Sequence, residues 1–268
     1  MQHGQVNNGT HSRRNSNHLS DNQIDEALRC WAQRTGLAQD DLAALQALPF
    51  TCRTVERDGF IVREGEQPTS CSLILSGSAF RQKVVHNGAR QIISFHFACE
   101  FIDLQSCLLG VNDHGVQALG PCTLAVVPKV ALLEVVQKRP SLALAMWFDT
   151  LVEGAIFREW VVNVGRRSAK ARVAHLLCEL ALRLDKIGAG KDGNYEFPLT
   201  QEQLADATGL TPVHTNRTLQ ALRTDRLIEL NGRSLKVIDW PDLRRVGDFD
   251  ELYLHHQPEA DERAVGAG

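Results

Sequence analysis

The sequence predicts an α+β fold in which a domain of short antiparallel strands is followed by a long helix and by a small helical domain that carries a hairpin. Short apolar runs separated by Gly, Asn or Pro extend from about Thr51 to Val127, and helical apolar spacing extends from about Lys129 to Val164. Two capped helices and a hairpin then lie between Leu199 and Ile238. We therefore predict five segments: a disordered arm (1–22), a β domain with N-terminal helices (23–128), a long helix (129–165), a helical domain (166–247) and a tail (248–268).

Composition indicates a soluble protein of ordinary globular type. The 268 residues leave room for two modest domains, with 43% hydrophobic and 23% charged residues. No apolar run reaches the roughly 18–20 residues that cross a bilayer, so we expect no membrane partner. The polar segment 1–22 lacks the apolar core of a secretory signal, which indicates a cytoplasmic protein.

The seven cysteines are scattered and include no C-x-x-C pair. This pattern is typical of reduced thiols in a cytoplasm and not of a disulfide framework. Most of them are expected to be buried as small hydrophobic side chains.

The first half of the chain reads as helices followed by strands. Residues 23–48 carry apolar positions at helical spacing and predict one or two short helices. The runs FIV, SLIL, QIISF and TLAVV then predict short strands, and Asn87-Gly88 is a strong hairpin signal.

The long helix is apolar on more than one face, so it must be buried on more than one face. We expect one face to pack on the β domain and the other on the same helix of a second subunit, which predicts a homodimer. The alternative is a helix enclosed within one chain. The residues predicted to face the partner are Leu144, Trp147, Leu151 and Ile156.

Ser168 is a predicted N-cap for the helix that directly follows it, and a Gly-rich loop comes next at 186–197. Two short helices with strong capping signals follow this loop. Thr200 with Gln203 forms a capping-box pattern, and the first helix is expected to end near Gly209. Thr211 then caps a second helix whose first residue is Pro212. Two helices joined by such a turn predict a helix-turn-helix.

The second of these helices has one face for the core and one for a partner. Thr215, Leu219 and Leu222 share the inward face, while the opposite face offers side chains suited to base edges in a major groove. Amides and a guanidinium supply hydrogen bonds, and a valine supplies contact for a thymine methyl. The predicted base-reading residues are Val213, His214, Asn216, Arg217 and Gln220.

A hairpin around Asn231-Gly232, with a type I′ turn signal, completes a winged helix. From Gly165 to Lys236 there are twelve Lys or Arg against eight Asp or Glu, so this part is locally basic although the whole chain has a formal charge of −3. The predicted phosphate contacts are Thr200, Thr211, Arg166, Lys170 and Arg233, and Arg167, Arg172 and Lys236 are further basic candidates.

The order of these parts resembles the CRP/FNR superfamily of bacterial transcription regulators over roughly residues 45–240. FIVREGEQPTSCSLILSGSAF is similar to two strands and turns of the family's antiparallel, jelly-roll-like β-roll, and LTQEQLADATGLTPVHTNRTLQALRTDRLIEL is similar to its DNA-binding helices. By this resemblance Arg217 takes the place of the base-reading arginine, and Val213 replaces a glutamate that accepts a hydrogen bond from cytosine. We therefore expect a half-site that differs at that base pair.

The resemblance also implies an effector pocket, which is degenerate here. Members that bind cyclic AMP carry Gly-Glu for the ribose and Arg-Ser or Arg-Thr for the phosphate. Aligned on FIDLQS, these places hold Asp103-Leu104 and His114-Gly115, which are poor phosphate ligands, so no cyclic AMP is expected as cofactor. The close-set N-terminal cysteines of an iron–sulfur centre are missing before Cys30.

The predicted function is a homodimeric regulator that binds double-stranded DNA at a pseudo-palindromic site and recruits or blocks RNA polymerase. The alternative is a redox or small-molecule sensor that signals through protein contacts, with thiol chemistry at Cys99, Cys107 or Cys122. No constellation of nucleophile, base and orienting group predicts an enzyme, and His96 and His114 have no partner at metal-ligand spacing.

Overall fold

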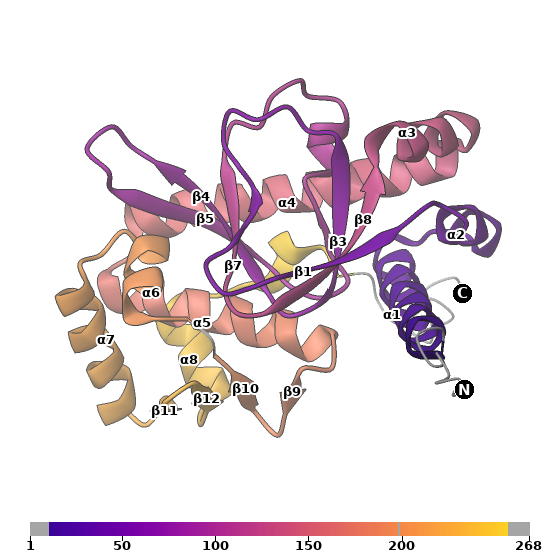
Figure 1. The fold of residues 1–268 in the computed structure, drawn as a ribbon. Coiled ribbons are helices and arrows are strands. Elements are labelled where there is room, and N and C mark those ends of the chain that lie inside the picture. The colour runs from indigo at the N-terminus through magenta and orange to yellow at the C-terminus, as the bar shows by residue number, and fades with distance from the viewer. Residues whose placement is uncertain (1–10, 198, 257–268) are drawn as a thin grey trace, which may run out of the picture.

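The computed structural model describes residues 11–197 and 199–256 and consists of a β domain, a long helix beside it and a winged-helix domain (Figure 1). The strands of the β domain are β1 (Thr51–Val55), β2 (Phe60–Val62), β3 (Ser70–Ser76), β4 (Ala79–Val84), β5 (Arg90–His96), β6 (Phe101–Ile102), β7 (Gly115–Ala118) and β8 (Cys122–Pro128), with the 3-10 turn η1 (Leu104–Cys107).

These strands form two antiparallel four-stranded sheets, β1-β8-β3-β6 and β2-β7-β4-β5. The sheets enclose a small apolar core that includes Ile74, Val116 and Leu124, each fully buried. The hairpin predicted at Asn87-Gly88 is confirmed, because β4 and β5 pair from Ala79 opposite His96 to Val84 opposite Arg90. The predicted antiparallel β-roll is therefore present.

The N-terminal helix is longer than predicted. Helix α1 spans His11–Thr35 and α2 spans Gln39–Gln46. The expectation of disorder over 1–22 is thus wrong for residues 11–22, while residues 1–10 lie outside the described residues. No Gly or Pro occurs between residues 11 and 35. The buried side chains of Leu28 and Trp31 hold the C-terminal half of the helix in the core, and each residue added toward the N-terminus gains one backbone hydrogen bond.

The predicted long helix is in fact two helices. Helix α3 spans Lys129–Lys138 and α4 spans Pro140–Arg166, and Arg139 between them is non-helical, with φ −136° and ψ 89°. Proline disfavours helical geometry in the residue before it and is well suited to the first position of a helix. Pro140 therefore ends one helix and begins the next.

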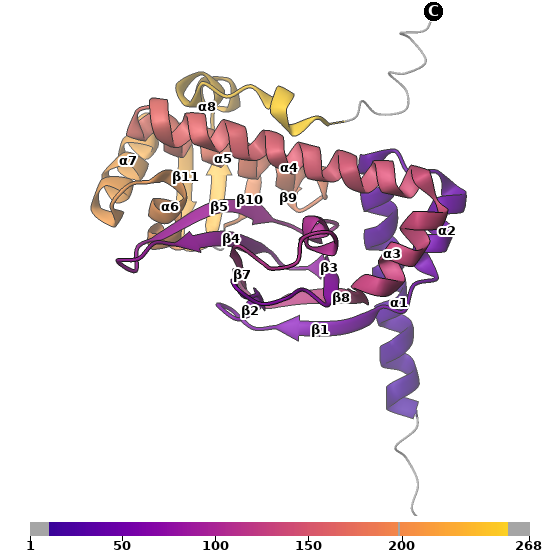
Figure 2. The same cartoon turned by 90° about the horizontal axis from the view of Figure 1, so that it is seen from above.

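Helix α4 runs along the molecule from the α3 end to the winged-helix domain (Figure 2). By length and composition alone it could cross a membrane, but this is weak grounds for a membrane role. Its inner face packs in the protein core through Leu142, Ile156 and Trp160.

The winged-helix domain comprises α5 (Ala169–Lys186), α6 (Gln201–Thr208), α7 (Pro212–Thr224), α8 (Trp240–Gly247) and a sheet of four strands in the order β11-β12-β10-β9. Strands β11 (Ile228–Asn231) and β12 (Ser234–Val237) are the predicted hairpin. The predicted loop 186–197 contains two further strands, β9 (Gly190–Lys191) and β10 (Asn194–Glu196). These strands were missed because they are very short, and β10 depends on pairing with β12.

The turn of the β11–β12 hairpin is not the predicted type I′. Asn231 pairs with Ser234, so the two central residues are Gly232 and Arg233, and of these only Gly232 has a positive φ, at 60°. Type I′ needs positive φ at both central residues, whereas positive φ at the first alone is the pattern of type II′. Gly232 does form the turn with a positive φ, but it is the first of the two central residues and not the second.

Residues 248–256 belong to the folded domain and not to a tail. They include the short 3-10 helix η2 (Glu251–Leu254), and Phe249 and Leu254 are buried in the core of the winged-helix domain. The remaining residues of the predicted tail, 257–268, lie outside the described residues.

One apolar core joins the two domains. It contains Phe80 and Phe95 of the β domain, Trp160 of α4 and the buried face of α5. The rings of Phe95 and Trp160 meet edge to face at 5.7 Å. Helix α6 also lies against β5, where the Arg90 guanidinium pairs with Asp206 at 2.7 Å.

Candidate functional site

The helix-turn-helix unit has the local structure that its sequence predicts. The Thr200 hydroxyl accepts a hydrogen bond from the Gln203 backbone N–H at 3.1 Å, and the Gln203 side chain accepts from the Thr200 N–H, which completes the capping box. The Thr211 hydroxyl accepts from the His214 N–H and Pro212 opens α7. The side chain of Ser168 caps α5 in the same way.

Gly209 sets the angle between the two helices. It ends α6 in the left-handed conformation, with φ 64° and ψ 36°. An L side chain in this conformation costs about 1–2 kcal/mol, and glycine avoids that cost. Leu210, the next residue, packs against the core, and the chain then changes direction into α7.

Helix α7 has one buried and one exposed face. Thr215 and Leu222 are fully buried, and Leu219 is buried in the same apolar core as Leu204 of α6. All five residues predicted to read bases are exposed: Val213, His214, Asn216, Arg217 and Gln220. The helix therefore presents a continuous polar strip on a rigidly packed element.

The guanidinium of Arg217 makes no hydrogen bond or ion pair with any residue of 11–197 or 199–256 in the structure. The neighbouring Asn216 amide, in contrast, donates a hydrogen bond to Gln201 of α6 at 3.0 Å. Arg217 is thus available to an external partner without breaking an internal contact.

The predicted phosphate contacts lie in different environments. Arg166 and Arg233 are exposed, whereas Lys170 is half-buried and pairs with Asp225. The hydroxyls of Thr200 and Thr211 accept the capping hydrogen bonds and keep their own proton for donation.

Thr200 and Arg233 line a cleft between α6 and the β4–β5 hairpin, together with Arg57 and Gln91 of the β domain. Access of a bulky partner to these two residues therefore depends on the space between the domains.

Two further basic candidates serve the fold. The Arg167 guanidinium pairs with Glu159 at 2.7 Å and with Asp248 at 3.4 Å. The Arg172 guanidinium donates to the backbone carbonyls of Arg167 and Thr208. Both arginines are engaged inside the domain and are not available to an external phosphate.

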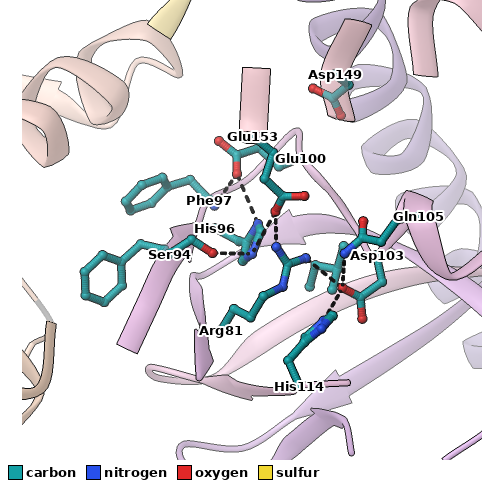
Figure 3. Close-up of polar contacts among 12 residues, drawn as sticks. Arg81, Ser94, His96, Phe97, Glu100, Asp103, Gln105, His114, Asp149 and Glu153 are labelled. Atoms are coloured by element: carbon teal, nitrogen blue, oxygen red, sulfur yellow. Dashed lines mark hydrogen bonds and ion pairs between the residues drawn. The ribbon is translucent and has the colours of Figure 1, made fainter. Parts of the chain in front are cut away.

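The predicted effector pocket is occupied by an internal ion network (Figure 3). Asp103 is 3% exposed, and its Oδ1 accepts from Arg81 Nη2 at 2.7 Å and from His114 Nε2 at 2.8 Å. Arg81, on β4, is 1% exposed and its other terminal nitrogen pairs with Glu153 of α4. A carboxylate of the protein itself therefore neutralises the buried cation.

The pocket residues differ in what they contribute. Asp103 and His114 are brought together, but Leu104 belongs to the apolar core beside α1 and Gly115 pairs with Gln82 inside a sheet. Arg81 and Glu153 were missed by the sequence analysis. Nothing in the run AFRQKV marks Arg81, because only the fold brings β4, α4 and the segment around Asp103 together.

Charge pairing shifts the protonation of this site. Burial raises the pKa of Asp103, but the hydrogen bond from His114 and the charge of Arg81 outweigh it, so the pKa lies below its ordinary value. Burial lowers the pKa of His114, but its hydrogen bond to Asp103 outweighs that effect and raises the pKa overall. The two groups therefore favour the carboxylate–imidazolium pair.

A second ion cluster extends from this site toward the winged-helix domain. Glu100, in the turn after β5, accepts from Arg183 of α5 at 2.9 and 3.0 Å and lies 3.7 Å from Arg34 of α1. His96 lies 3.6 Å from Glu100 and 3.7 Å from Glu153, which links the two clusters (Figure 3). Charged groups thus connect α1, the β domain, α4 and α5.

The outer face of α4 carries an exposed apolar stripe. Leu144, Trp147 and Leu151 are 60%, 62% and 53% exposed. Ile156, predicted on the same stripe, is 7% exposed and packs in the intrachain core, so that part of the prediction is wrong. Ile156 lies five residues beyond Leu151, a rotation of about 140° around the helix axis, which turns it to the opposite side.

Family models match both domains of the chain. Residues 52–139 match the cyclic nucleotide-binding domain, and residues 171–246 match the Crp-like helix-turn-helix domain. The first match covers the β-roll and α3, and the second covers most of α5 through most of α8.

Relatives and solved structures agree with these matches. The chain is 27% identical over 195 residues to a probable transcriptional activator of Rhizobium leguminosarum bv. viciae, covering 72% of this chain and 80% of the relative. It is 25% identical over 198 residues to the transcriptional activator protein FnrL of Cereibacter sphaeroides, covering 72% and 78%. The structure of FixK2 from Bradyrhizobium japonicum has the same fold, with a TM-score of 0.69, 22% identity and coverage of 74% and 98%.

The two family models match the chain in the same order as the β-roll and the winged helix-turn-helix occur in the fold. The two relatives are named as a probable transcriptional activator and a transcriptional activator protein. The chain belongs to the CRP/FNR superfamily and is a DNA-binding transcription regulator of the CRP/FNR type.

Proposed function

We propose that this regulator acts in the cytoplasm as a homodimer, binds a pseudo-palindromic DNA site through α7 and requires no cyclic nucleotide. It would act on transcription by recruiting or blocking RNA polymerase at the bound site. The observation that carries the DNA-reading role is the exposed polar strip of α7, in which Arg217 has no partner among the described residues.

Each side chain of this strip suits a base edge. An arginine fork can bind O6 and N7 of guanine, amides such as those of Asn216 and Gln220 can bind adenine, and Val213 can contact a thymine methyl. The capped N-terminus of α7 is the end that enters the groove in helix-turn-helix proteins. Arg166 and Arg233 would bind phosphates and hold the helix in register.

The exposed stripe of α4 supports dimerisation. Leu144, Trp147 and Leu151 follow the spacing of a helix–helix seam, and a monomer would leave these large apolar side chains in water. Two copies related by a two-fold axis would bury the stripe and place two α7 helices in successive major grooves, about 34 Å apart.

Replacing Trp147 by glutamate is expected to dissociate the dimer. A large aromatic side chain near the centre of an interface commonly contributes 2 kcal/mol or more, so dimer affinity should fall roughly 30-fold or more. Sedimentation velocity over a range of concentrations measures the shift. Val130→Glu on α3, where the valine is 66% exposed outside the α4 stripe, is the matched control and should leave the dimer intact. Equal dimer affinity in Trp147→Glu and wild type would contradict the assigned interface.

The occupied pocket supports independence from cyclic nucleotides. A cyclic phosphate needs a cation that is free to bind it, and the buried Arg81 is already held by Asp103 and Glu153. Displacing either carboxylate would leave a buried charge without its partner, which is energetically costly.

Selection from random duplex DNA tests the proposal. Reduced protein without added ligand is expected to enrich a pseudo-palindrome, and binding should weaken steeply with salt because phosphate contacts release counterions. Added cyclic AMP is expected to leave the enrichment unchanged. Enrichment that appears only with cyclic AMP would contradict the independence from cyclic nucleotides and leave the DNA-reading role of α7 standing. Absence of enrichment under both conditions would contradict the DNA-reading role of α7.

A further inference from the structure

A cavity of about 580 Å³ lies between α1, the turn after β5, α4, α5 and the residues after η2. It is separate from the Arg81–Asp103 network and borders the Glu100 cluster. Its walls mix apolar side chains such as Phe148 and Val152 with the charged groups Arg34 and Arg183. A cavity of this size admits small molecules.

Two cysteines from distant parts of the sequence line this cavity. Cys30 lies in α1 and Cys99 lies in the turn between β5 and β6, and both are partly exposed. The backbone of Cys99 has a positive φ of 67°, an uncommon conformation for a residue other than glycine. Its N–H donates to the Ile74 carbonyl at 2.9 Å, which holds the turn in place.

The two thiols are unequal. A hydrogen bond from Cys99 lowers the pKa of Cys30, burial opposes this, and the charge of Arg34 lowers the pKa further, to about 7 overall. The same contact raises the pKa of Cys99, and burial raises it further. The lowered pKa favours the thiolate, the reactive form, at Cys30, and the raised pKa favours the protonated thiol at Cys99.

Four other cysteines are buried and are less accessible than Cys30 and Cys99. Cys122 and Cys178 are fully buried, and burial raises the pKa of each thiol to about 12. Cys71 and Cys107 are neighbours, but they are only 1% and 3% exposed, and the Cys71 thiol donates to the Ile102 carbonyl. Cys30 and Cys99, in contrast, are partly exposed and line one cavity.

We propose that Cys30 and Cys99 form an oxidisable dithiol that peroxides convert to a disulfide joining α1 to the turn between β5 and β6. Both cysteines line the same cavity and both are partly exposed. This oxidation does not depend on the DNA-binding role.

The reaction takes place in two steps. The Cys30 thiolate attacks one oxygen of hydrogen peroxide, the O–O bond breaks, and Cys30 becomes a sulfenic acid while hydroxide leaves and is protonated to water. The sulfur of Cys99 then attacks the sulfenic sulfur, the S–S bond forms and the S–O bond breaks. The departing hydroxide takes the Cys99 proton, so two thiols and one peroxide give one disulfide and two waters.

The position of the pair relates it to the winged-helix domain. Cys99 precedes Glu100, which binds Arg183 of α5, and Arg34 lies one helical turn after Cys30 and 3.7 Å from Glu100. A disulfide would therefore form beside the ion pairs that connect the β domain to α5.

Peptide mapping after peroxide treatment tests the proposal. Full-length protein is treated with hydrogen peroxide near neutral pH, blocked with an alkylating agent and digested without reduction. A peptide cross-linked between Cys30 and Cys99 is expected, and it should be absent in Cys30→Ser and Cys99→Ser but present in Cys52→Ser. Cys52 is exposed on β1 and serves as the matched control. Oxidation of Cys30 that ends as sulfinic acid, or a cross-link from Cys30 to any other cysteine, would overturn the assignment.

A kinetic measurement on the wild-type protein needs no substitution. The rate of iodoacetamide labelling at Cys30, followed by mass spectrometry, is expected to rise with pH through a midpoint of about 7. In Cys99→Ala the midpoint should move to higher pH, because the hydrogen-bond donor that lowers the pKa of Cys30 is lost. A midpoint near the ordinary thiol value in the wild type would contradict the paired arrangement.

Discussion

Replacing Arg217 by alanine is expected to weaken binding to the selected site by about 1–3 kcal/mol per half-site, or roughly 5- to 150-fold, and to flatten base preference at one position. The guanidinium lies on the exposed face of α7 and makes no hydrogen bond or ion pair with the described residues, so its removal should leave the fold intact. The loss should therefore reflect a missing base contact and not a damaged domain. Fluorescence anisotropy on the selected duplex and on variants with each alternative base at the guanine measures both effects.

Arg233→Ala provides the contrast for this experiment. A phosphate contact carries no sequence information, so its removal should weaken binding to all duplexes by a similar factor and reduce the salt slope by about one. If Arg217→Ala behaves in the same way as Arg233→Ala, then Arg217 is a phosphate contact and another residue of α7 reads the base.

Replacing Asp103 by alanine is expected to destabilise the protein by about 3–5 kcal/mol, because it removes one partner of a buried ion pair. Arg81 is 1% exposed and would keep only Glu153 as a partner, while His114 would lose the acceptor at Nε2 and keep only Asp113 at Nδ1. Urea unfolding monitored by circular dichroism gives the change in free energy of unfolding.

A double variant separates the lost pair from a general packing defect. Arg81→Met combined with Asp103→Leu removes both charges and keeps apolar volume, so it should be less destabilised than the sum of the two single changes. Additive effects would mean that the two side chains stabilise the fold independently, which would contradict the network described here.

The same network predicts a pH dependence of opposite sign for its two titrating groups. The folded pKa of Asp103 lies below the ordinary 3.8, so its contribution is present above that value and is lost as pH falls toward the folded pKa. The folded pKa of His114 lies above the ordinary 6.5, so its contribution is present below that value and is lost as pH rises through the folded pKa. The difference in unfolding free energy between wild type and Asp103→Ala should therefore be largest between these limits and decline on both sides.

Features that depend on neighbouring residues were predictable from the sequence. The capping box at Thr200, the N-caps at Ser168 and Thr211 and the two hairpins follow from short-range hydrogen bonds and backbone preferences. The division of α7 into two faces follows from the helical repeat, which needs no knowledge of the rest of the fold. These signals were sufficient to indicate the family and the DNA-binding helix.

Features that depend on distant parts of the chain were decided by the tertiary structure. Strand β10 pairs with β12 of the wing, and β9 pairs with β10, only when the domain closes. Arg81 lies in an unremarkable strand sequence, yet it is the centre of the ion network that fills the predicted pocket.

The sequence by itself determined the order of the domains and the surface that α7 presents, because caps, turns and helical periodicity act within a few residues. Only the tertiary structure decided which charges are buried together and which thiols share a cavity. Arg81 meets Asp103 and Glu153, and Cys30 and Cys99 line one cavity, across separations in the chain that carry no local signal. The energy of such contacts comes from burial and from pairing in a region of low dielectric constant, and both arise only once the elements have packed.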